Sequence, residues 1–301
     1  MLQTERNTAT VAGATNAIAS GVCHGTLGEL IQGPVIHDGQ LQIGLISLPV
    51  QRYSWMHFVA GEDGEHARDL PDKEKCRRAI ALYLARHGRR LPPGRWVHDS
   101  ELLQGKGMAS STADIVASIR CLDRIFGLAS PPELIADVLR EVERSDSVFL
   151  DRYALYLSAR QVALQHFSHD PHFHVCYIDE GREVVTEAVT QALLDHYAAN
   201  LAAYQANLDL ALAAFDGADR AQIARCASVS AALAQEALPK RHYAAVVARR
   251  AHFGAAGIVV AHTGSLIGYL FFDAPGATAM GELSAFFRGL GHQCRFAQTG
   301  F

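Results

Sequence analysis

The sequence predicts an α+β protein in which strands and helices are mixed along the whole chain. Residues 41–45 alternate between apolar and polar or small side chains directly after the hairpin signal Asp38-Gly39, as strands joined by a tight turn do. Between Ile115 and Phe126, apolar residues recur at spacings of four, three and four, which forms one apolar helix face. Strand-like and helical patterns also mix in the second half, so α+β architecture is expected in both halves.

The first half contains further strand and helix signals on either side of a glycine-rich loop. Strand-like sequence covers 21–60, helical sequence covers 72–87, and a strand over 95–102 leads into the loop. The helix that follows the loop is expected to end at Gly127, a residue suited to the left-handed conformation of a helix end.

Two more helices are expected before the middle of the chain. The first starts at residues 130–133, because Ser130 can cap it, proline tolerates the first turn and Glu133 takes the capping-box position. It should run to about residue 143, and after a break a further amphipathic helix should span about 148–167.

A shift in composition to His, Asp and Pro at 168–173 predicts a domain junction. We expect an N-terminal domain over 1–170, with 1–18 as a flexible tail, and a C-terminal domain over 171–301. The elements expected in the second domain are strands over 174–178, 257–261, 266–272 and 294–298, Ala-rich helical sequence over 193–238, and helices over 241–252 and 277–290.

The composition is that of an ordinary globular protein of 301 residues. Apolar residues make up 49% and charged residues 19%, and the net charge of −4 offers no basic surface for nucleic acid. No apolar run reaches the length of a membrane span, and the first twenty residues lack the pattern of a signal peptide. Six scattered cysteines without a C-x-x-C pair are typical of reduced thiols. We therefore expect a cytoplasmic protein with no membrane or nucleic-acid partner.

The glycine-rich loop is the strongest candidate for a ligand site. Backbone N–H groups at a helix N-terminus and the positive end of the helix dipole attract an anion, most often a phosphate. An ordinary capped helix after a loop explains the pattern equally well, since Gly-x-Gly before a helix is frequent by chance. The candidate cofactor-binding residues are Gly105, Lys106, Gly107, Met108, Ala109, Ser110, Ser111 and Thr112.

Two acidic residues, Glu143 and Asp146, follow the next expected helix and could serve phosphoryl transfer. That reaction needs Mg²⁺ held by a carboxylate and a group that orients the attacking hydroxyl. Glu143 could bind the metal together with the Ser111 hydroxyl, and Asp146 could accept a proton or steer the hydroxyl. From spacing alone, solvated acids at a helix terminus are the simpler interpretation, and Ser111 could equally be a helix N-cap.

Two further glycine-containing stretches could approach a ligand closely. Residues 23–33 place three glycines in a strand-like context, with Glu29 and Gln32 as polar contacts; the alternative is a strand with bulges or turns. The turn His262-Thr263-Gly264-Ser265, between two apolar strands, could press backbone N–H groups toward a phosphate or a substrate, or it could be merely a hairpin turn.

Taken together, these stretches resemble the motifs of the GHMP kinases, the superfamily of galactokinase, homoserine kinase and mevalonate kinase. The similarity is strongest to its L-threonine kinase branch, which makes O-phosphothreonine for the aminopropanol arm of cobalamin. The segments that carry the resemblance are Gly-Glu-Leu-Ile-Gln-Gly at Gly28–Gly33, Lys-Gly-Met-Ala-Ser-Ser-Thr-Ala-Asp-Ile at Lys106–Ile115, Glu-x-x-Asp-Ser from Glu143 to Ser147, and His-Thr-Gly-Ser at His262–Ser265.

The resemblance implies a ribosomal-protein-S5-like N-terminal domain and a ferredoxin-like C-terminal domain. ATP and Mg²⁺ would lie between them, with the phosphates over the loop at 105–112 and the metal held by Ser111 and Glu143. Asp146 matches a position where some members carry a catalytic aspartate, while others work without a base there. The acceptor, a small hydroxy amino acid, would bind near Thr26, Glu29, Gln32, His262, Thr263, Gly264 and Ser265.

Two departures from the family pattern lie where the acceptor should bind. Thr26 stands near the place of a lysine that some relatives carry, and His24-Gly25 replaces the Pro-Ala typical of the threonine kinases. The acceptor is therefore L-threonine, another hydroxy amino acid such as serine or homoserine, or an unrelated small alcohol. A sensor that binds ATP without turnover is the alternative from another class, although the retained acids argue against it. The helical second half could supply the face of a homodimer.

Overall fold

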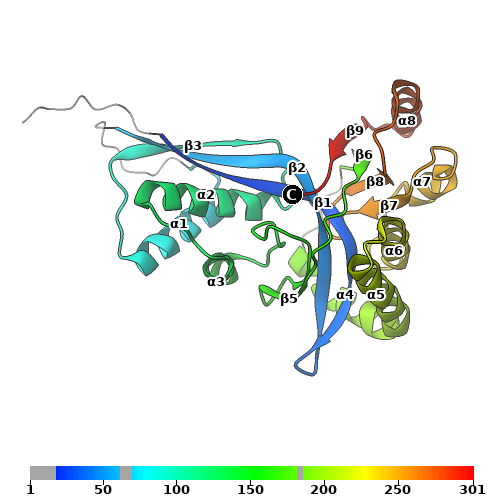
Figure 1. Ribbon diagram of the computed structural model, residues 1–301, viewed down its shortest axis with the longest axis horizontal. Coiled ribbons are helices and arrows are strands. Elements are labelled where there is room, and N and C mark those ends of the chain that lie inside the picture. The colour runs from blue at the N-terminus through cyan, green and yellow to red at the C-terminus, as the bar shows by residue number, and fades with distance from the viewer. Residues whose placement is uncertain (1–17, 62–69, 182–185) are drawn as a thin grey trace, which may run out of the picture.

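The computed structural model describes residues 18–61, 70–181 and 186–301, and it is built around one long β-hairpin (Figure 1). Strands β1 (Ile18–His37) and β2 (Gln40–Ala60) pair antiparallel along most of their length. The predicted turn at Asp38-Gly39 joins them, and both turn residues have positive φ, 52° and 71°. In Figure 1 the hairpin runs from the left end of the molecule to its middle and bends there toward its turn, and helices from both halves of the fold pack on the same two strands.

The glycine-containing stretch 23–33 is the irregular part of β1. Its pairing with β2 shifts register between His24 and Gly25 and twice more around Glu29. Bulges of this kind bend a strand and redirect its side chains. Glu29 also pairs with Val260 of β7 (Gly257–Val260), so the irregular stretch lies where the two halves of the sheet meet.

The nine strands of the described residues form one sheet, in the order β5-β4-β2-β1-β7-β8-β6-β9, with β3 paired to the far end of β2. Strands from both sides of residue 170 therefore share a sheet, and the division into two domains at that point stays a prediction. The shorter strands are β3 (Gly94–Ser100), β4 (Ala154–Leu157), β5 (Val162–His166), β6 (His174–Asp179), β7 (Gly257–Val260), β8 (Leu266–Phe271) and β9 (Arg295–Gln298).

In the described residues, three helices lie at the end of the hairpin away from its turn, where β1 starts and β2 ends. They are α1 (Glu74–His87), α2 (Ser110–Phe126) and α3 (Pro132–Val142). Helix α2 lies directly on β1 and β2, and most of its residues are buried. Gly21 of β1 permits this approach, because a Cβ there would lie 2.0 Å from the carbonyl oxygen of Ala117. The burial of α2 fixes its N-terminus, and with it the preceding loop, relative to the sheet.

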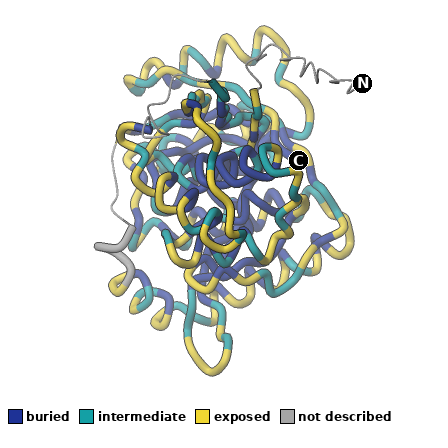
Figure 2. Tube along the Cα trace, turned by 90° about the vertical axis from the view of Figure 1, so that its left-hand side faces the viewer, coloured by how far each residue is buried: buried dark blue, intermediate teal, exposed yellow. Residues whose placement is uncertain are grey.

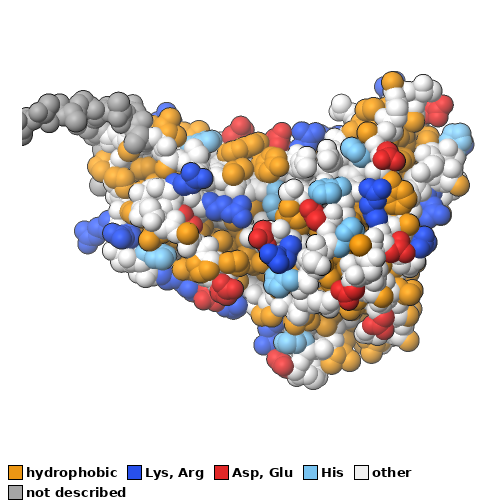
Figure 3. All heavy atoms as spheres, viewed as in Figure 1, with side chains coloured by type: hydrophobic (Ala, Val, Ile, Leu, Met, Phe, Trp, Pro, Cys, Tyr) orange, Lys and Arg blue, Asp and Glu red, His pale blue; other side chains and the backbone are white. Residues whose placement is uncertain are grey.

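In the described part of the chain, five helices accompany the C-terminal strands, and α5 (Leu201–Asp216) and α6 (Arg220–Leu233) among them pack on each other and on β1. Figure 2 shows that buried segments gather in the middle of the fold while exposed segments lie around them. On the face seen in Figure 3, acidic and basic side chains are interspersed. The helices are α4 (Thr186–Ala199), α5 (Leu201–Asp216), α6 (Arg220–Leu233), α7 (Tyr243–Arg249) and α8 (Ala277–Gly289).

The predicted helix over 148–167 is wrong, because this stretch forms a β-hairpin. Strands β4 and β5 pair antiparallel across a turn at 158–161, and all of β4 is buried. A short apolar run fits a buried strand as well as a helix, and here β4 also pairs with β2. The long-range pairing therefore overrides the helical pattern.

The predicted cap at Ser130 is also wrong. Pro131 occupies the N-cap position of α3, and no side chain caps that helix. Ser130 instead donates from its backbone N–H and its hydroxyl to the carboxylate of Asp123 in α2, at 2.9 and 2.8 Å. The residue ties the end of α2 to the start of α3.

The other expected elements are present with ends shifted by a few residues, and the α+β fold class is confirmed. The helical sequence over 193–238 is divided among α4, α5 and α6. Apart from Ile18, the tail expected over 1–18 lies outside the described residues. None of the helices in the described ranges is both long and apolar enough to cross a membrane.

Candidate active site

Three stretches that are far apart in the sequence meet at the N-terminus of α2. The loop at 105–109 lies between β1 on one side and the turn 262–265 on the other. Backbone N–H groups of these neighbours donate to successive loop carbonyls at 3.0–3.1 Å, in the pairs Thr26–Met108, Gly28–Gly107 and Ser265–Lys106. The loop is therefore held in place through its carbonyl oxygens.

Glycine is required where the loop touches the turn. Gly107 has a φ of +92°, and a Cβ there would lie 2.2 Å from the Cβ of Ala261. A Cβ on Gly264 would lie 2.2 Å from the carbonyl oxygen of Lys106. These two glycines allow the loop and the turn to pack backbone against backbone.

Helix α2 begins without a cap. Its N-cap residue is Ala109, which has a left-handed backbone with φ 53° and no side chain that could accept a hydrogen bond. The first helical bond runs from the Ala113 N–H to the Ala109 carbonyl, so the N–H groups of residues 110–112 have no partner within the helix. Helix α6, by contrast, is capped by Asp219, which accepts from the Gln222 N–H at 2.8 Å. An anion in front of α2 would satisfy these donors.

The carboxylate of Glu143 lies beside the first turn of α2. Its Oε2 accepts from the Ser111 hydroxyl at 2.8 Å and its Oε1 from the Thr112 hydroxyl at 2.8 Å. Lys75 of α1 pairs with Oε2 at 2.6 Å, and the Glu143 side chain is only 8% exposed. Glu143 is therefore not a solvated acid, and Ser111 is not a helix cap. The structure brings these two predicted metal ligands together.

Asp146 lies in the same irregular segment, 143–147, that follows α3. Its Oδ1 accepts from the Ser47 hydroxyl at 3.4 Å. Burial, and after it the negative charges of Glu29 and Glu143, together raise the pKa of Asp146 from 3.8 to about 7, against the lowering effect of the Ser47 hydrogen bond. A carboxyl with a pKa near neutrality can accept a proton at physiological pH and release it again.

A cavity of about 110 Å³ connects the loop to Asp146. Arg144 supplies the positive charge among the described side chains that line it, and Glu29 and Asp146 supply the negative charges. The lining residues are Glu29, Gln32, Ile43, Leu45, Gly107, Arg144, Ser145, Asp146, Ser158, Leu193 and Thr263. Of the expected acceptor-binding residues, Glu29, Gln32 and Thr263 face this cavity.

The other expected acceptor-binding residues support the backbone around the cavity and do not line it. Thr26 is buried, and its hydroxyl donates to the Gly107 carbonyl at 3.5 Å. His262 is also buried, and its N–H and Nδ1 both contact Glu29 Oε2 at 2.9 Å. Gly264 packs against the loop, and Ser265 donates from its hydroxyl to Asp179. Their direct contact with an acceptor stays a prediction.

Sequence reasoning missed three residues of this region. Lys240 is buried, and its Nζ donates to the carbonyls of His262 and Gly264 at 3.1 and 2.8 Å. Lys75 pairs with Glu143, and Arg144 lines the cavity. Two of them lie on elements whose position depends on long-range packing. Arg144 could have been identified from the sequence, because it lies between Glu143 and Asp146.

The chain is similar in sequence to known proteins. Residues 74–158, which include the loop, Ser111, Glu143 and Asp146, match the family described as GHMP kinases N terminal domain. The chain carries a GHMP kinase N-terminal domain. Over 267 residues it is 25% identical to the L-threonine kinase of Citrobacter freundii, covering 84% of this chain and 86% of that one.

Solved structures extend the GHMP kinase fold to nearly the whole chain. The mevalonate kinase of Methanococcus jannaschii superposes with a TM-score of 0.72 at 12% identity, covering 96% of this chain and 100% of that one. The homoserine kinase of Cytophaga hutchinsonii gives 0.62 at 12% identity, covering 97% of each chain. These GHMP fold neighbours carry the names of different kinases, so the fold alone does not identify the acceptor.

Proposed function

We propose that this GHMP-type kinase transfers the γ-phosphoryl group of ATP to the side-chain hydroxyl of L-threonine, giving O-phospho-L-threonine and ADP. The observation that carries the proposal is the cavity lined by both Gly107 and Asp146. Gly107 belongs to the loop before the uncapped helix α2, and the Ser111–Glu143 pair lies at the start of that helix. A phosphate donor, a metal site and an acceptor pocket would then adjoin one another, as phosphoryl transfer requires.

The uncapped start of α2 is suited to the phosphates of ATP. The loop carbonyls are used by β1 and the turn 262–265, whereas the N–H groups of residues 110–112 lack helical partners. No acidic residue occupies the first turn of α2 itself, and the Glu143 carboxylate beside that turn is paired with Lys75. This end of the helix therefore offers donors and positive potential at one place.

Ser111 and Glu143 fit a magnesium ion as protein ligands. Mg²⁺ prefers oxygen ligands, and in kinase sites one or two protein groups commonly hold it together with phosphate oxygens and water. The pair supplies one hydroxyl and one carboxylate already in contact, and Lys75 shows that a cation is accommodated against the same carboxylate. Bound there, the ion would neutralise charge that develops on the transferred phosphoryl group.

The cavity is suited to a small zwitterionic acceptor. Its volume of about 110 Å³ lies well below the roughly 300–1,000 Å³ of pockets for drug-sized ligands, so a compact molecule fits it best. Arg144 would bind the carboxylate of the amino acid, and the acidic side of the cavity at Glu29 would receive its ammonium group. Leu45 and Leu193 would face its methyl group, a contact that favours threonine over serine by about 1–3 kcal/mol.

Asp146 would orient the acceptor hydroxyl and take up its proton during attack on the phosphorus. Its pKa of about 7 leaves a substantial fraction ionised at neutral pH. The rate gain would come mainly from holding the reacting groups in line and from neutralising charge, with the proton acceptor as a smaller contribution.

The test is a screen of the purified protein with ATP, Mg²⁺ and a panel of hydroxy amino acids, with products identified by mass. We expect phosphorylated threonine as the main product and slower turnover of serine and homoserine. Nucleotide binding without any phosphorylated product would instead support the sensor. From the motif resemblance we further propose that the product serves the aminopropanol arm of cobalamin, so that omission of the protein should block formation of this arm.

Compartment and assembly complete the proposal. All six cysteines are unpaired and five of them are buried, which fits reduced thiols of the cytoplasm.

We also propose that the C-terminal helices form the face of a homodimer, since Leu210 of α5 and Val229 of α6 are exposed apolar residues on that side of the sheet. Light scattering of the purified protein distinguishes a dimer from a monomer.

A further inference from the structure

The segment 143–147, which carries both Glu143 and Asp146, contains neither helix nor strand. Glu143 ends α3 with an extended backbone, φ −158° and ψ 163°, so the chain leaves the helix directly. Backbone groups in such a segment need partners from outside regular structure. The separation of the two carboxylates therefore depends on whatever supplies those partners.

Gln161, the last residue of the β4–β5 turn, supplies one such backbone partner and also binds a side chain of the segment. Its Nε2 donates to the Glu143 carbonyl at 3.0 Å and to the Ser158 carbonyl at 3.1 Å. Its Oε1 accepts from the hydroxyls of Ser145 and Tyr156. Both donors and both acceptor positions of the amide are used, which is the full capacity of a Gln side chain.

The backbone at Gln161 adopts a conformation that residues with a Cβ do not favour. Its φ is +57°, a left-handed conformation that favours glycine and is uncommon for residues with a Cβ. The residue is nevertheless a buried Gln, at 4% exposure. Its position is fixed in turn by β4, which pairs with β2 through Leu45, a residue that lines the acceptor cavity.

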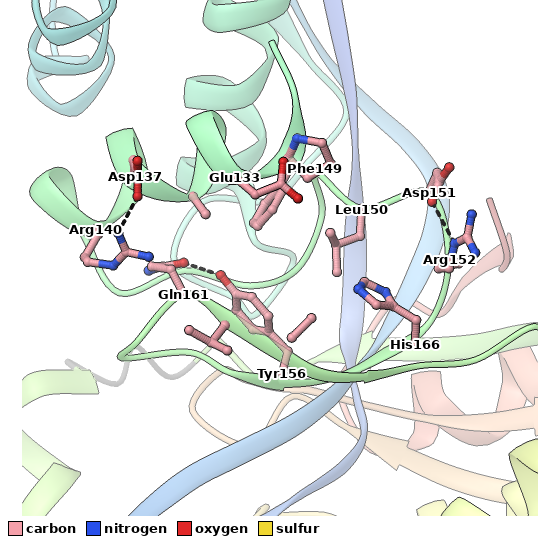
Figure 4. Close-up of a pocket in the computed structure, with 14 residues that line it drawn as sticks. Glu133, Asp137, Arg140, Phe149, Leu150, Asp151, Arg152, Tyr156, Gln161 and His166 are labelled. Atoms are coloured by element: carbon pink, nitrogen blue, oxygen red, sulfur yellow. Dashed lines mark hydrogen bonds and ion pairs between the residues drawn. The ribbon is translucent and has the colours of Figure 1, made fainter. Parts of the chain in front are cut away.

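Tyr156 and Ser145 complete the network. Burial raises the pKa of Tyr156, so its hydroxyl remains a donor at all relevant pH values. Ser145, between the two acids, also donates its backbone N–H to the Ser158 carbonyl at 3.4 Å. Figure 4 shows the Gln161 and Tyr156 side chains joined by a hydrogen bond on the wall of a pocket of about 630 Å³ that is also lined by residues of α3.

We propose that Gln161 is a positioning residue that sets the placement of the Glu143 and Asp146 carboxylates through the backbone of Glu143 and the side chain of Ser145. The inference rests on the proposed kinase function, because it assigns these acids to the metal and to the acceptor. Gln161 touches neither ligand. It acts by holding the segment that carries both acids.

Two substitutions separate positioning from folding. Gln161→Gly removes the amide but suits the left-handed backbone, so the turn is retained. Gln161→Glu keeps the size of the side chain and removes both N–H donors. Gln165→Gly and Gln165→Glu are the matched controls, because Gln165 lies in the same hairpin and its side chain donates to Asp216, at 3.5 Å.

The first measurement is hydrogen exchange of the backbone amides at 143–147, which does not depend on turnover. We expect at least tenfold faster exchange in both Gln161 variants and wild-type rates in both Gln165 variants. Unchanged exchange in Gln161→Gly and Gln161→Glu would overturn the positioning role, whether or not the protein is a kinase.

The second measurement is steady-state kinetics with ATP and L-threonine. We expect kcat to fall about tenfold to a hundredfold in the Gln161 variants, with KM for ATP changed less than threefold because the loop at 105–112 is untouched. A merely structural residue would lower the melting temperature without this separation of kcat from KM. A kcat within twofold of wild type would overturn the inference, whereas a wild-type protein that turns over no acceptor would overturn the proposed function alone.

Discussion

The Asp146 carboxylate destabilises the folded protein at alkaline pH, and its removal should therefore increase stability. Asp146 is half-buried beside Glu29 and Glu143, and burial together with these charges raises its pKa from 3.8 to about 7. A pKa that is higher in the folded state means that the folded protein binds this proton more tightly. The stabilising contribution is complete below about pH 4 and is lost as pH rises through about 7.

The magnitude follows from the difference of about three between the two pKa values. At about 1.4 kcal/mol for each whole pKa number, the upper limit is about 4 kcal/mol. Water screens part of the interaction at a half-buried group, so we expect Asp146→Asn to gain about 1–3 kcal/mol at pH 8. The uncharged amide keeps a similar shape and can still accept a hydrogen bond from the Ser47 hydroxyl.

The assay is thermal unfolding of wild type and Asp146→Asn at pH 4 to 8.5 in EDTA, so that no metal contributes. The variant should melt a few degrees higher at pH 8 and coincide with wild type near pH 4. Its kcat with threonine should fall at least tenfold with little change in KM, as expected for a proton acceptor. A stability difference that is absent, or constant across this pH range, would refute the electrostatic reasoning.

Four further substitutions test the rest of the site. Glu143→Gln should lower kcat at least a hundredfold with an unchanged far-UV spectrum; near-normal turnover would remove Glu143 from the metal site. Ser111→Ala should weaken binding of Mg-ATP about tenfold in calorimetry and leave binding of ATP in EDTA unchanged. Arg144→Met should raise KM for L-threonine about tenfold to a hundredfold, and an equal KM would exclude a carboxylate contact. Gly107→Ala should raise KM for ATP and lower the melting temperature, because the added Cβ would lie 2.2 Å from Ala261; ATP binding at wild-type strength would argue against the loop.

Much of the fold could be predicted because its signals are local. Asp38-Gly39 marks the central turn, the spacing from Ile115 to Phe126 marks α2, and Gly127 ends that helix with a φ of 64°. The error at 148–167 has the opposite origin. Whether that apolar run forms a strand depends on its pairing with β2, about a hundred residues away in the sequence.

The candidate site divides in the same way. The loop, Ser111, Glu143 and Asp146 could be proposed from the sequence because their residue types and order suit phosphoryl transfer. The reasons for their placement were not visible, since they lie in contacts across the fold such as Lys240 beneath the 262–265 turn. Nothing in the sequence marks Gln161, because a glutamine within the helix predicted over 148–167 would be an ordinary polar residue.

Glu29 also has a structural role that the sequence did not indicate. It faces the acceptor cavity, but one of its oxygens is occupied by the backbone N–H and ring of His262 at 2.9 Å. His262 in turn contacts the Ser230 hydroxyl at 3.1 Å. The two motifs at 23–33 and 262–265 therefore form one hydrogen-bonded unit. The sequence of either stretch alone does not reveal this contact.

The central claim is that the uncapped start of α2 binds the phosphates of ATP beside an acceptor cavity. The most direct test is a crystal structure with a non-hydrolysable ATP analogue, Mg²⁺ and L-threonine. We predict that the triphosphate lies against the backbone N–H groups of residues 107–112 and that the threonine hydroxyl points at the γ-phosphate from the side of Asp146. A nucleotide bound elsewhere, with the loop making no phosphate contact, would contradict the claim.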